Sequence, residues 1–252
     1  MKQVTAQVIS NTELMPDVHL LWLQAPEMAK VAQPGQFVMV RCGEGLDPLL
    51  RRPFSIHRVA NGGQIALLFN IVGRGTDWLS QCQEGDPLDL LGPLGKGFSL
   101  QPASRRLLLV AGGIGIAPLV FLAEKALNQG GSIRLLMGAP NASSLYPGSL
   151  LPPSIDLITA TEDGSEGRKG MVTELMSDFV NQADQVFACG PASMYQSMAA
   201  QSCLTGRPVQ ISLEVRMGCG LGACYSCTIK TRKGLQQVCR DGPVFELDDI
   251  LW

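Results

Sequence analysis

Four cysteines set among glycines near the end of the chain constrain this sequence more than any other feature. Cys219, Cys224 and Cys227 are spaced C-x4-C-x2-C, and Cys239 follows after eleven further residues. The first three have the spacing of a plant-type [2Fe-2S] site, whose fourth cysteine comes later in the chain. The interleaved glycines let the backbone wrap closely and turn its N–H groups toward cluster sulfurs. The pattern therefore predicts a [2Fe-2S] centre.

A zinc site and a pair of disulfides are the other interpretations of the same cysteines. Zinc sites usually combine two C-x2-4-C pairs, and Cys239 has no such neighbour in the sequence. The first residues lack the apolar core of a signal peptide. We therefore expect a cytoplasmic, reducing setting in which cysteines bind metal. The four scattered cysteines are expected to be small buried hydrophobic residues: Cys42, Cys82, Cys189 and Cys203.

Composition excludes some classes of function. Only 17% of the 252 residues are charged, against roughly 25% in a typical soluble protein, which favours a surface partly covered by another subunit. The net charge is −2 without a basic block, so nucleic-acid binding is not expected. The uncharged run 107–123 approaches the length of a membrane span. Its central glycines and Pro118 favour a strand–turn–helix instead, and no membrane span is expected.

Residues 1–100 are predicted to form a small antiparallel β-barrel. Short β-rich runs alternate with turn residues and no helical pattern intervenes, which is typical of such barrels. Six candidate strands are expected, at 4–9, 18–23, 36–41, 54–57, 64–69 and 87–91.

Residues 101–213 have a different pattern, which predicts a doubly wound parallel sheet. Mostly apolar runs are typical of buried parallel strands, and helical segments separate several of them. The expected strands are 107–111, 133–137, 155–159, 185–189 and 209–213, and the expected helices are 118–128, 172–181 and 192–200. Residues 214–252 form the cluster segment, which is too short for a core of its own and is expected to order with its metal.

Three stretches have the character of phosphate sites. Gly112, Gly113 and Gly115 stand where a strand gives way to a helix, close to a dinucleotide fingerprint, although Pro118 replaces its last glycine. Proline is tolerated there because the first helical turn loses no hydrogen bond. Residues 50–55 offer two cations and a hydroxyl, and 70–76 form a glycine-flanked turn. Each stretch alone is weak evidence for phosphate binding, since a tight turn or a solvated strand edge would have a similar sequence.

Together these motifs resemble the ferredoxin–NADP reductase superfamily over the whole chain. The resemblance is carried by Pro34–Phe37, Arg52–Ser55, Gly92–Gly95, Gly112–Pro118, and Cys189–Pro191 with Met194. Within that superfamily, the C-terminal part is similar to the electron-transfer subunits of the NAD-dependent, two-subunit dihydroorotate dehydrogenase. This closer similarity is carried by Glu214–Cys224 and Val238–Phe245.

The resemblance implies a set of cofactor-binding residues. FAD would lie in the barrel against the second domain, with Arg52 on its pyrophosphate and Ser55 beside the nitrogen that accepts hydride. The other flavin residues would be Pro53, Phe54, Asn70, Ile71 and Val72, with Gly75 and Thr76 on phosphate. NADH would dock over Gly112, Gly113 and Gly115, with Cys189, Gly190 and Pro191 near the nicotinamide. The alternative for Cys189 is a buried thiol.

The expected activity is electron transfer. The stretch 138–144 has no Arg or Lys for a 2′-phosphate, so NADH is favoured over NADPH. NADH gives two electrons and the cluster takes one at a time, so a flavin must stand between them. By the resemblance, an FMN-bearing catalytic subunit would oxidise dihydroorotate in pyrimidine biosynthesis, with two copies of each chain in a heterotetramer.

Other functions remain open from the sequence. They are the flavin subunit of sulfide dehydrogenase or of NADH-dependent ferredoxin–NADP reductase, a stand-alone ferredoxin or flavin reductase, and a zinc-bearing binding module. The apolar neighbours of the cysteines either pack beneath the cluster loop or form a rim that docks on a partner. These neighbours are Met217, Leu221, Tyr225, Val244 and Phe245.

Overall fold

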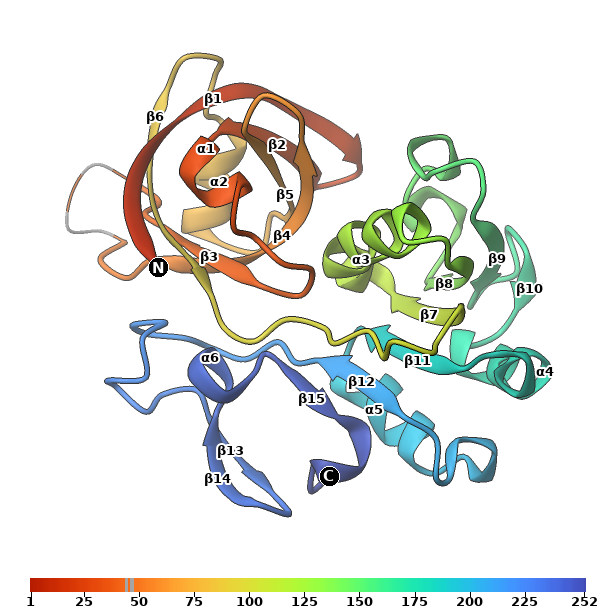
Figure 1. The fold of residues 1–252 in the computed structure, drawn as a ribbon. Helices are drawn as coiled ribbons and strands as arrows, with labels where there is room; N and C mark the ends of the chain where they lie inside the picture. The colour runs from red at the N-terminus through yellow and green to blue at the C-terminus, as the bar shows by residue number, and fades with distance from the viewer. Residues whose placement is uncertain (44, 46–47) are drawn as a thin grey trace.

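The computed structural model describes residues 1–43, 45 and 48–252, and its first part is a closed antiparallel barrel (Figure 1). The strand order is β1-β2-β5-β4-β3-β6. The strands are β1 (Lys2–Met15), β2 (Val18–Gln24), β3 (Phe37–Val40), β4 (Arg52–Ala60), β5 (Gln64–Asn70) and β6 (Pro87–Leu94). Two short helices accompany them, α1 (Pro26–Ala29) and α2 (Arg74–Ser80). Each of the six expected runs overlaps one of these strands, and the run 36–41 exceeds β3 by one residue at each end, which confirms the barrel.

Strand β1 is longer than its apolar pattern predicts. The polar stretch from Ser10 to Glu13 stays in the strand because it pairs with β2, with bulges that interrupt the register. Asn11 also has a second role, since its side-chain amide donates to the carbonyls of Leu79, Ser80 and Cys82, each at 3.0 Å. These bonds satisfy carbonyl groups at the end of α2, which helps to fix α2 on the barrel.

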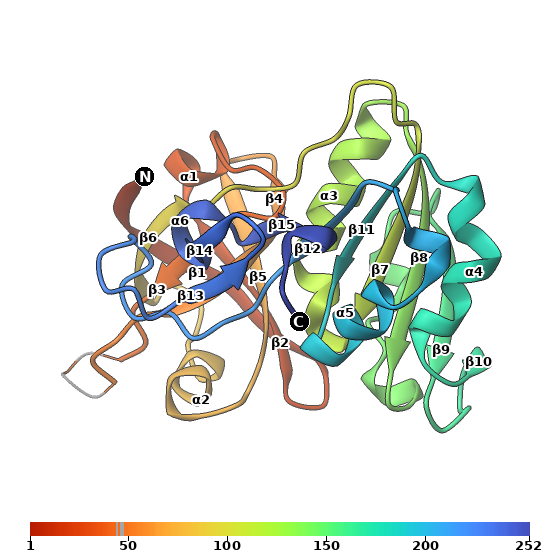
Figure 2. The same ribbon diagram turned by 90° about the horizontal axis from the view of Figure 1, so that it is seen from below.

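The second part is a seven-stranded sheet in the order β10-β9-β8-β7-β11-β12-β15. Its strands are β7 (Arg106–Gly112), β8 (Ser132–Ala139), β9 (Asp156–Thr161), β10 (Arg168–Lys169), β11 (Gln185–Cys189) and β12 (Val209–Ser212), all parallel, with antiparallel β15 (Val244–Glu246) at one edge. Helix α3 (Ile116–Asn128) covers the face toward the barrel, and α4 (Met176–Phe179) and α5 (Ala192–Ala199) cover the other (Figures 1 and 2). The doubly wound sheet is thus confirmed.

Successive side chains of β7 point to opposite faces of the sheet, so the strand contributes to both helical layers. Leu107 and Leu109 pack in the cluster that includes α3, whereas Leu108 and Val110 pack in the cluster that includes α4 and α5. A strand buried on both faces requires such a continuous apolar run.

The prediction of one continuous helix over 172–181 is wrong. The chain there makes a 3-10 turn η4 (Val172–Leu175), the single turn α4, and a second 3-10 turn η5 (Val180–Gln182). Phe179, with φ of −121°, leaves helical geometry between α4 and η5.

Further 3-10 turns are η1 (Gly113–Gly115), η2 (Ala142–Ser144), η3 (Gly148–Leu150), η6 (Ser202–Leu204) and η7 (Leu247–Asp249). The link between β8 and β9 holds only such short turns, as its prolines predict.

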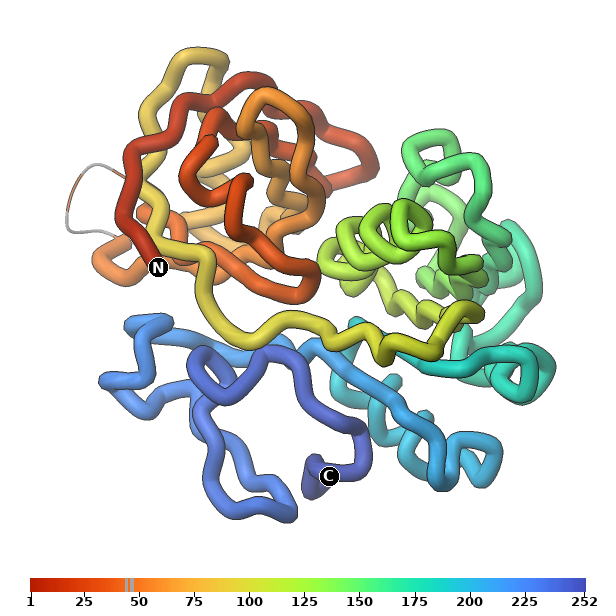
Figure 3. Tube along the Cα trace, in the orientation of Figure 1, coloured from red at the N-terminus to blue at the C-terminus, as the bar shows by residue number. Residues whose placement is uncertain are grey.

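Residues 214–252 lie below the barrel and beside the second sheet (Figures 1 and 3). They contain the hairpin β13 (Thr228–Thr231) and β14 (Gly234–Gln237), the turn α6 (Val238–Asp241), and β15. Their buried apolar residues share one core cluster with α4 and α5, which agrees with a segment too short for a core of its own. The segment also contacts the linker after β6, where the Lys96 N–H donates to the Gly242 carbonyl at 2.6 Å.

A buried histidine joins the barrel to the second sheet. The His57 ring on β4 bonds the Ala117 carbonyl of α3 through Nδ1 at 2.9 Å and the Tyr146 hydroxyl through Nε2 at 3.1 Å. Burial lowers the pKa of His57 to about 3 and outweighs the Ala117 hydrogen bond, which raises it. The imidazole is therefore neutral at ordinary pH. Beside it, Arg58 pairs with Glu124 of α3 at 2.9 Å.

None of the helices in the described part of the chain combines the length and the apolar character that crossing a membrane requires.

Candidate functional site

A cavity of about 730 Å³ lies where the barrel, α3 and the start of the cluster segment meet, and we call it the interdomain cavity. Its size is in the range of cofactor sites. The barrel contributes an apolar floor that includes Phe37, Phe54, Leu68 and Phe69. The remaining lining comes from β4 with Leu50, from β5 with Val72, from α2, from Ile114 and Ala117, and from 212–217 with Pro243.

The polar groups of this cavity suit a phosphate-bearing cofactor. The Arg52 side chain lies across the start of α2, where a Cβ added at Gly75 would approach the Arg52 Nε at 3.3 Å. A guanidinium beside a helix start is an arrangement that binds phosphate. The Oδ1 atom of Asn70 is buried on the cavity wall and has no hydrogen-bond partner. Because a buried acceptor without a partner is costly, this atom favours a bound donor.

Most of the residues predicted for FAD meet in this cavity. Its lining includes Arg52, Pro53, Phe54, Ser55, Asn70, Val72 and Thr76. Ile71 and Gly75 lie just behind it: the Ile71 N–H donates to the Asp17 carbonyl at 2.8 Å, and Gly75 makes room for Arg52. The Thr76 hydroxyl is used locally, since it accepts from the Val72 and Gly73 N–H groups at 2.8 and 3.2 Å. It therefore shapes the turn that carries Val72.

The glycines predicted for NADH lie at the carboxyl ends of β7 and β11, which are neighbours in the sheet. The strand order reverses between these two strands, and such a switch point is where open parallel sheets bind ligands. The two turns touch: a Cβ at Gly115 would lie 2.0 Å from the Cys189 carbonyl oxygen, and one at Gly112 would lie 2.9 Å from Pro191. Glycine is thus required for close packing between the two turns.

Cys189 is a buried thiol that is 1% exposed. Its Sγ donates to the Ser212 carbonyl at 3.5 Å, and burial raises its pKa well above the ordinary value. The side chain is therefore a neutral thiol, while its carbonyl and the following Gly190 face the glycine turn.

Carboxylates lie beside the stretch that lacks a cation for a 2′-phosphate. The Glu162 and Asp163 N–H groups donate to the carbonyls of Ala139 and Pro140, at 3.1 and 3.2 Å. The Ala142 N–H donates to the Ser165 hydroxyl at 2.8 Å. The acidic loop after β9 is thereby fixed on the loop after β8, which strengthens the preference for NADH on electrostatic grounds.

The four cysteines of the C-terminal motif lie in two pairs. Cys219 and Cys224 are close neighbours, as are Cys227 and Cys239. Among the residues that the structure describes, no three His, Cys, Asp or Glu side chains are grouped so as to hold one metal ion. Two pairs of thiols fit a cluster with two irons better than a single tetrahedral zinc ion.

Backbone N–H groups already point at these sulfurs. The Leu221 N–H donates to the Cys219 Sγ at 3.3 Å, and the Gly222 N–H donates to the Cys239 Sγ at 3.2 Å. Gly220 and Gly222 have φ of 72° and 80°, which glycine adopts without strain. Such N–H groups stabilise cluster sulfur, so the backbone fits the predicted centre.

The environments of the two pairs differ. Cys224 is exposed, and its hydrogen bonds to Ser226 and then Cys219 lower its pKa to about 6. Cys239 is buried, and desolvation followed by its contact with Cys227 raises its pKa to about 12. One edge of the site therefore faces solvent while the other is enclosed by protein.

The interdomain cavity and the cysteine loop are adjacent. Met217 lines the cavity and stands two residues before Cys219, so their Cα atoms are at most about 7 Å apart. Gly220 lies against barrel strand β3, where an added Cβ would approach Met39 at 2.6 Å. A cofactor in the cavity and a cluster in the loop would thus be close neighbours.

Some apolar neighbours of the cysteines pack beneath the cysteine loop, and others form an exposed rim. Phe245 is buried, and Met217 and Val244 are half-buried. Leu221 and Tyr225 are 46% and 67% exposed. The exposed rim therefore consists of Leu221 and Tyr225, next to exposed Cys224.

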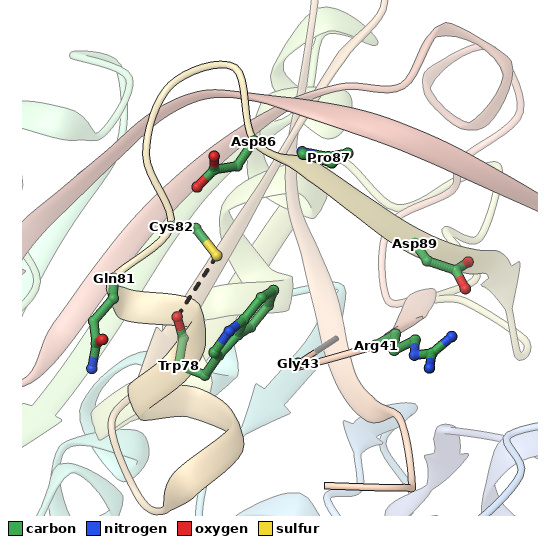
Figure 4. Close-up of a pocket in the computed structure, with 8 residues that line it drawn as sticks. All are labelled: Arg41, Gly43, Trp78, Gln81, Cys82, Asp86, Pro87 and Asp89. Carbon is green, nitrogen blue, oxygen red and sulfur yellow. Dashed lines mark hydrogen bonds between the residues drawn. The ribbon is translucent and has the colours of Figure 1, made fainter. Parts of the chain in front are cut away.

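A second cavity, of about 550 Å³, lies on the other side of α2 (Figure 4). Figure 4 shows Trp78 of α2 at its centre, with Arg41 and Asp89 on one side and Cys82 on the other. None of the residues predicted for a cofactor lines it.

Glu214 and Arg216 are cavity residues that no sequence motif marks as cofactor-binding. They follow β12 and bring one charge of each sign to the cavity wall. Glu214 is open to the cavity but surrounded by protein, and desolvation raises the pKa of its carboxyl. Their position directly after the last parallel strand was the available signal, because ligands bind at the carboxyl ends of such strands.

Comparison with known proteins identifies relatives of this chain. The family model for the iron–sulfur cluster binding domain of dihydroorotate dehydrogenase B matches residues 214–251. The electron-transfer subunit of dihydroorotate dehydrogenase B (NAD⁺) from Desulforamulus reducens is 40% identical over all of this chain and 99% of that protein. The subunit of the same name from Geobacillus thermodenitrificans is 37% identical over 97% of this chain and 96% of that protein.

Solved structures share the fold. An NADH-dependent reduced ferredoxin–NADP oxidoreductase superposes with a TM-score of 0.88 at 29% identity, over 99% of this chain and 90% of that one. The ferredoxin reductase of carbazole 1,9a-dioxygenase gives a TM-score of 0.71 at 18% identity, over 83% of this chain and 68% of that one, which shows the fold alone.

Proposed function

The chain belongs to the electron-transfer subunits of the NAD-dependent dihydroorotate dehydrogenase B, and from this we propose how its residues perform that function. The family is an NAD-dependent oxidoreductase subunit with FAD and a [2Fe-2S] cluster, which fits the interdomain cavity and the paired cysteines. FAD, when bound, supplies the exchange between a two-electron hydride donor and a one-electron cluster.

The interdomain cavity is the proposed FAD site. Its apolar floor would hold the flavin ring, with Pro53, Phe54 and Ser55 along β4. Asn70 would accept a hydrogen bond through its otherwise unpartnered Oδ1. Arg52 at the start of α2 would hold the pyrophosphate, with Gly75 giving it room. Ile71, Val72 and Thr76 would shape the turn that borders the cofactor.

The turns after β7 and β11 are the proposed NADH site. Gly112, Gly113 and Gly115 would allow the pyrophosphate to approach α3, whose preceding residues also border the flavin cavity. Gly190 and Pro191 would lie beside the nicotinamide, with the neutral Cys189 packed behind them. Since Ile114 and Ala117 line the interdomain cavity, the two cofactors would meet there.

Cys219, Cys224, Cys227 and Cys239 are the proposed cluster ligands, two for each iron. The cysteine spacing and the backbone N–H groups directed at the Cys219 and Cys239 sulfurs support this proposal. With Cys224 at the exposed edge, the cluster would be open toward solvent or a partner on one side and near the flavin on the other.

The name of the family implies a catalytic partner subunit, and the exposed rim is where we place it. Leu221 and Tyr225 would contact an FMN-bearing subunit that oxidises dihydroorotate, with two copies of each chain in the complex, in the cytoplasm. This arrangement puts Cys224 at the interface, because it lies between the two rim residues in the sequence.

The function is tested by reconstitution. The isolated chain is expected to oxidise NADH with artificial acceptors and to leave dihydroorotate unchanged. Addition of the FMN subunit should produce NAD-linked dihydroorotate oxidation, and Leu221→Glu should weaken it without loss of cluster absorbance. Leu235→Glu is the matched control, since Leu235 is 72% exposed and lies next to the turn of the hairpin β13–β14. Dihydroorotate oxidation by the isolated chain, or no association with the FMN subunit, would refute the assignment.

A further inference from the structure

Tyr195 on α5 is a buried residue whose hydroxyl bonds two other segments. It accepts a hydrogen bond from the Gly190 N–H at 2.9 Å and donates one to the Ser212 carbonyl at 2.6 Å. The residue is only 1% exposed. A tyrosine this deeply buried contributes both packing and a directed polar contact.

Both bonded groups lie where the sheet ladder ends. The pairing of β11 with β12 reaches Cys189 and Ser212 as its last pair, and Gly190 follows directly. Beyond the last pair, a backbone N–H or carbonyl needs another partner, and a buried group without one costs about 1–3 kcal/mol. The Tyr195 hydroxyl provides a partner to both groups at once, and the Cys189 thiol adds only a weak bond to the Ser212 carbonyl.

The two bonded segments have different proposed roles. Gly190 belongs to the turn that we place beside the nicotinamide. Ser212 lies on the wall of the interdomain cavity, where we place the flavin. One hydroxyl therefore fixes the nicotinamide turn relative to the flavin site, and hydride transfer depends on such positioning.

A third segment reaches Tyr195 from the end of the chain. The Trp252 ring lies 5.6 Å from the Tyr195 ring, centroid to centroid, at an interplanar angle of 33°. The residues before Trp252 are held to the hairpin of the cluster segment, since the Arg232 N–H donates to the Asp249 carbonyl at 2.7 Å. Lys233 also pairs with the Asp249 carboxylate at 2.5 Å.

We propose that Tyr195 is a positioning residue for the nicotinamide: its hydroxyl ties the Gly190 amide to the Ser212 carbonyl, and Trp252 holds its ring in place. This inference rests on the proposed NADH site and deepens it. It adds a specific link between the cluster segment and NADH binding, which neither the glycine turn nor the paired cysteines provide.

The test is Tyr195→Phe in the chain loaded with FAD and cluster. Loss of the two hydrogen bonds of this buried hydroxyl is expected to weaken NADH and NAD⁺ binding by about threefold to tenfold, measured by calorimetry. Amide hydrogen exchange of the peptide around Gly190 should become faster. FAD content and the cluster spectrum should stay unchanged, because the residues that hold them are untouched.

Tyr146→Phe is the matched control, since it removes another buried tyrosine hydroxyl, bonded to His57 on the barrel side. Equal loss of NADH affinity in both variants, or none in Tyr195→Phe, would overturn the proposal. A wild-type chain that does not bind NADH would overturn the proposed function and this inference with it.

Trp252→Ala provides a second, independent variant because its ring is partly exposed. It should weaken NADH binding in the same direction, and the double variant should show less than the sum of the two effects, since both act through one ring. Fully additive effects would contradict a common path through Tyr195.

Discussion

At the scale of single residues, neighbouring side chains of the same kind have different tasks. Arg51 and Arg52 are adjacent in the sequence, yet Arg51 pairs with Asp89 on the barrel at 2.5 Å while Arg52 borders the interdomain cavity. The sequence singles out both cations, and only the fold separates them. Residue type therefore predicts the chemistry of a site better than it predicts which copy performs it.

Arg52→Ala is expected to weaken FAD binding by about tenfold or more. The variant removes a charge-assisted bond to phosphate, worth about 1.5–3 kcal/mol, and each 1.4 kcal/mol is a factor of ten. Equilibrium titration of the apoprotein with FAD measures the change. Arg51→Ala is the control and should retain wild-type affinity. Equal affinities for wild type and Arg52→Ala would mean that the pyrophosphate binds elsewhere.

Cys224→Ala is expected to remove the iron and the acid-labile sulfide while FAD stays bound. In the proposed assignment the four thiols hold one cluster, whereas the proposed flavin cavity is lined by other residues. Iron, sulfide and flavin analysis of the purified variant tests this, with Cys203→Ala as a control at a cysteine outside the motif. Retention of both iron and sulfide in Cys224→Ala would remove Cys224 from the ligand set.

At the scale of elements, the periodic parts were predictable and the non-periodic parts were not. The barrel strands and the parallel strands have apolar runs that their burial requires. The segment from Val172 to Gln182 has the apolar spacing of a helix, but it forms two 3-10 turns with the single helical turn α4 between them. The hairpin β13–β14 and strand β15 are short and lack such runs, so their pairing could not be read from an apolar pattern.

The candidate site follows the same division. Motifs with fixed spacing predicted the cysteines and the glycine turn after β7, since their backbone geometry is local. Glu214 and Arg216 have only their place after the strand β12 as a sequence signal. Tyr195 has none, and it becomes relevant only when α5 is placed beside the turn after β11. Long-range packing of this kind is not encoded in any single window of sequence.

Gly115→Ala is expected to destabilise the protein more than Gly113→Ala does. The new methyl group would meet the Cys189 carbonyl oxygen at 2.0 Å, so the turns after β7 and β11 would have to separate. Overpacking of this kind costs about 1–3 kcal/mol or more. At Gly113 the space is open, and only its φ of 53° opposes alanine. Urea midpoints of the two variants compare these costs, and a smaller loss for Gly115→Ala would contradict the close packing of the turns.

At the scale of the whole molecule, the barrel and the second sheet are joined by the neutral His57. In the unfolded chain a histidine takes up a proton near pH 6.5, whereas the pKa of folded His57 is about 3. Between these values the unfolded state binds more protons, so stability falls as the pH drops from 6.5 toward 3 and is largest above 6.5.

This gives a pH-dependent prediction. Between pH 7 and pH 5 the His57 contribution to the unfolding free energy should fall by about 2 kcal/mol. His57→Gln, which cannot take up that proton, should show a correspondingly smaller loss in urea unfolding at the two pH values. The comparison cancels the other titrating groups, and identical losses for both proteins would show that His57 is not buried in its neutral form.

The whole molecule also sets the order of the proposed electron path, because the interdomain cavity lies between the nicotinamide turns and the cysteine loop. The most direct measurement is anaerobic addition of NADH to the isolated, FAD-loaded chain, followed by electron paramagnetic resonance. We expect the signal of the reduced cluster to appear, and to be absent from FAD-free protein and from Cys224→Ala. A cluster that stays oxidised in the FAD-loaded wild type, or that NADH reduces without FAD, would contradict this account.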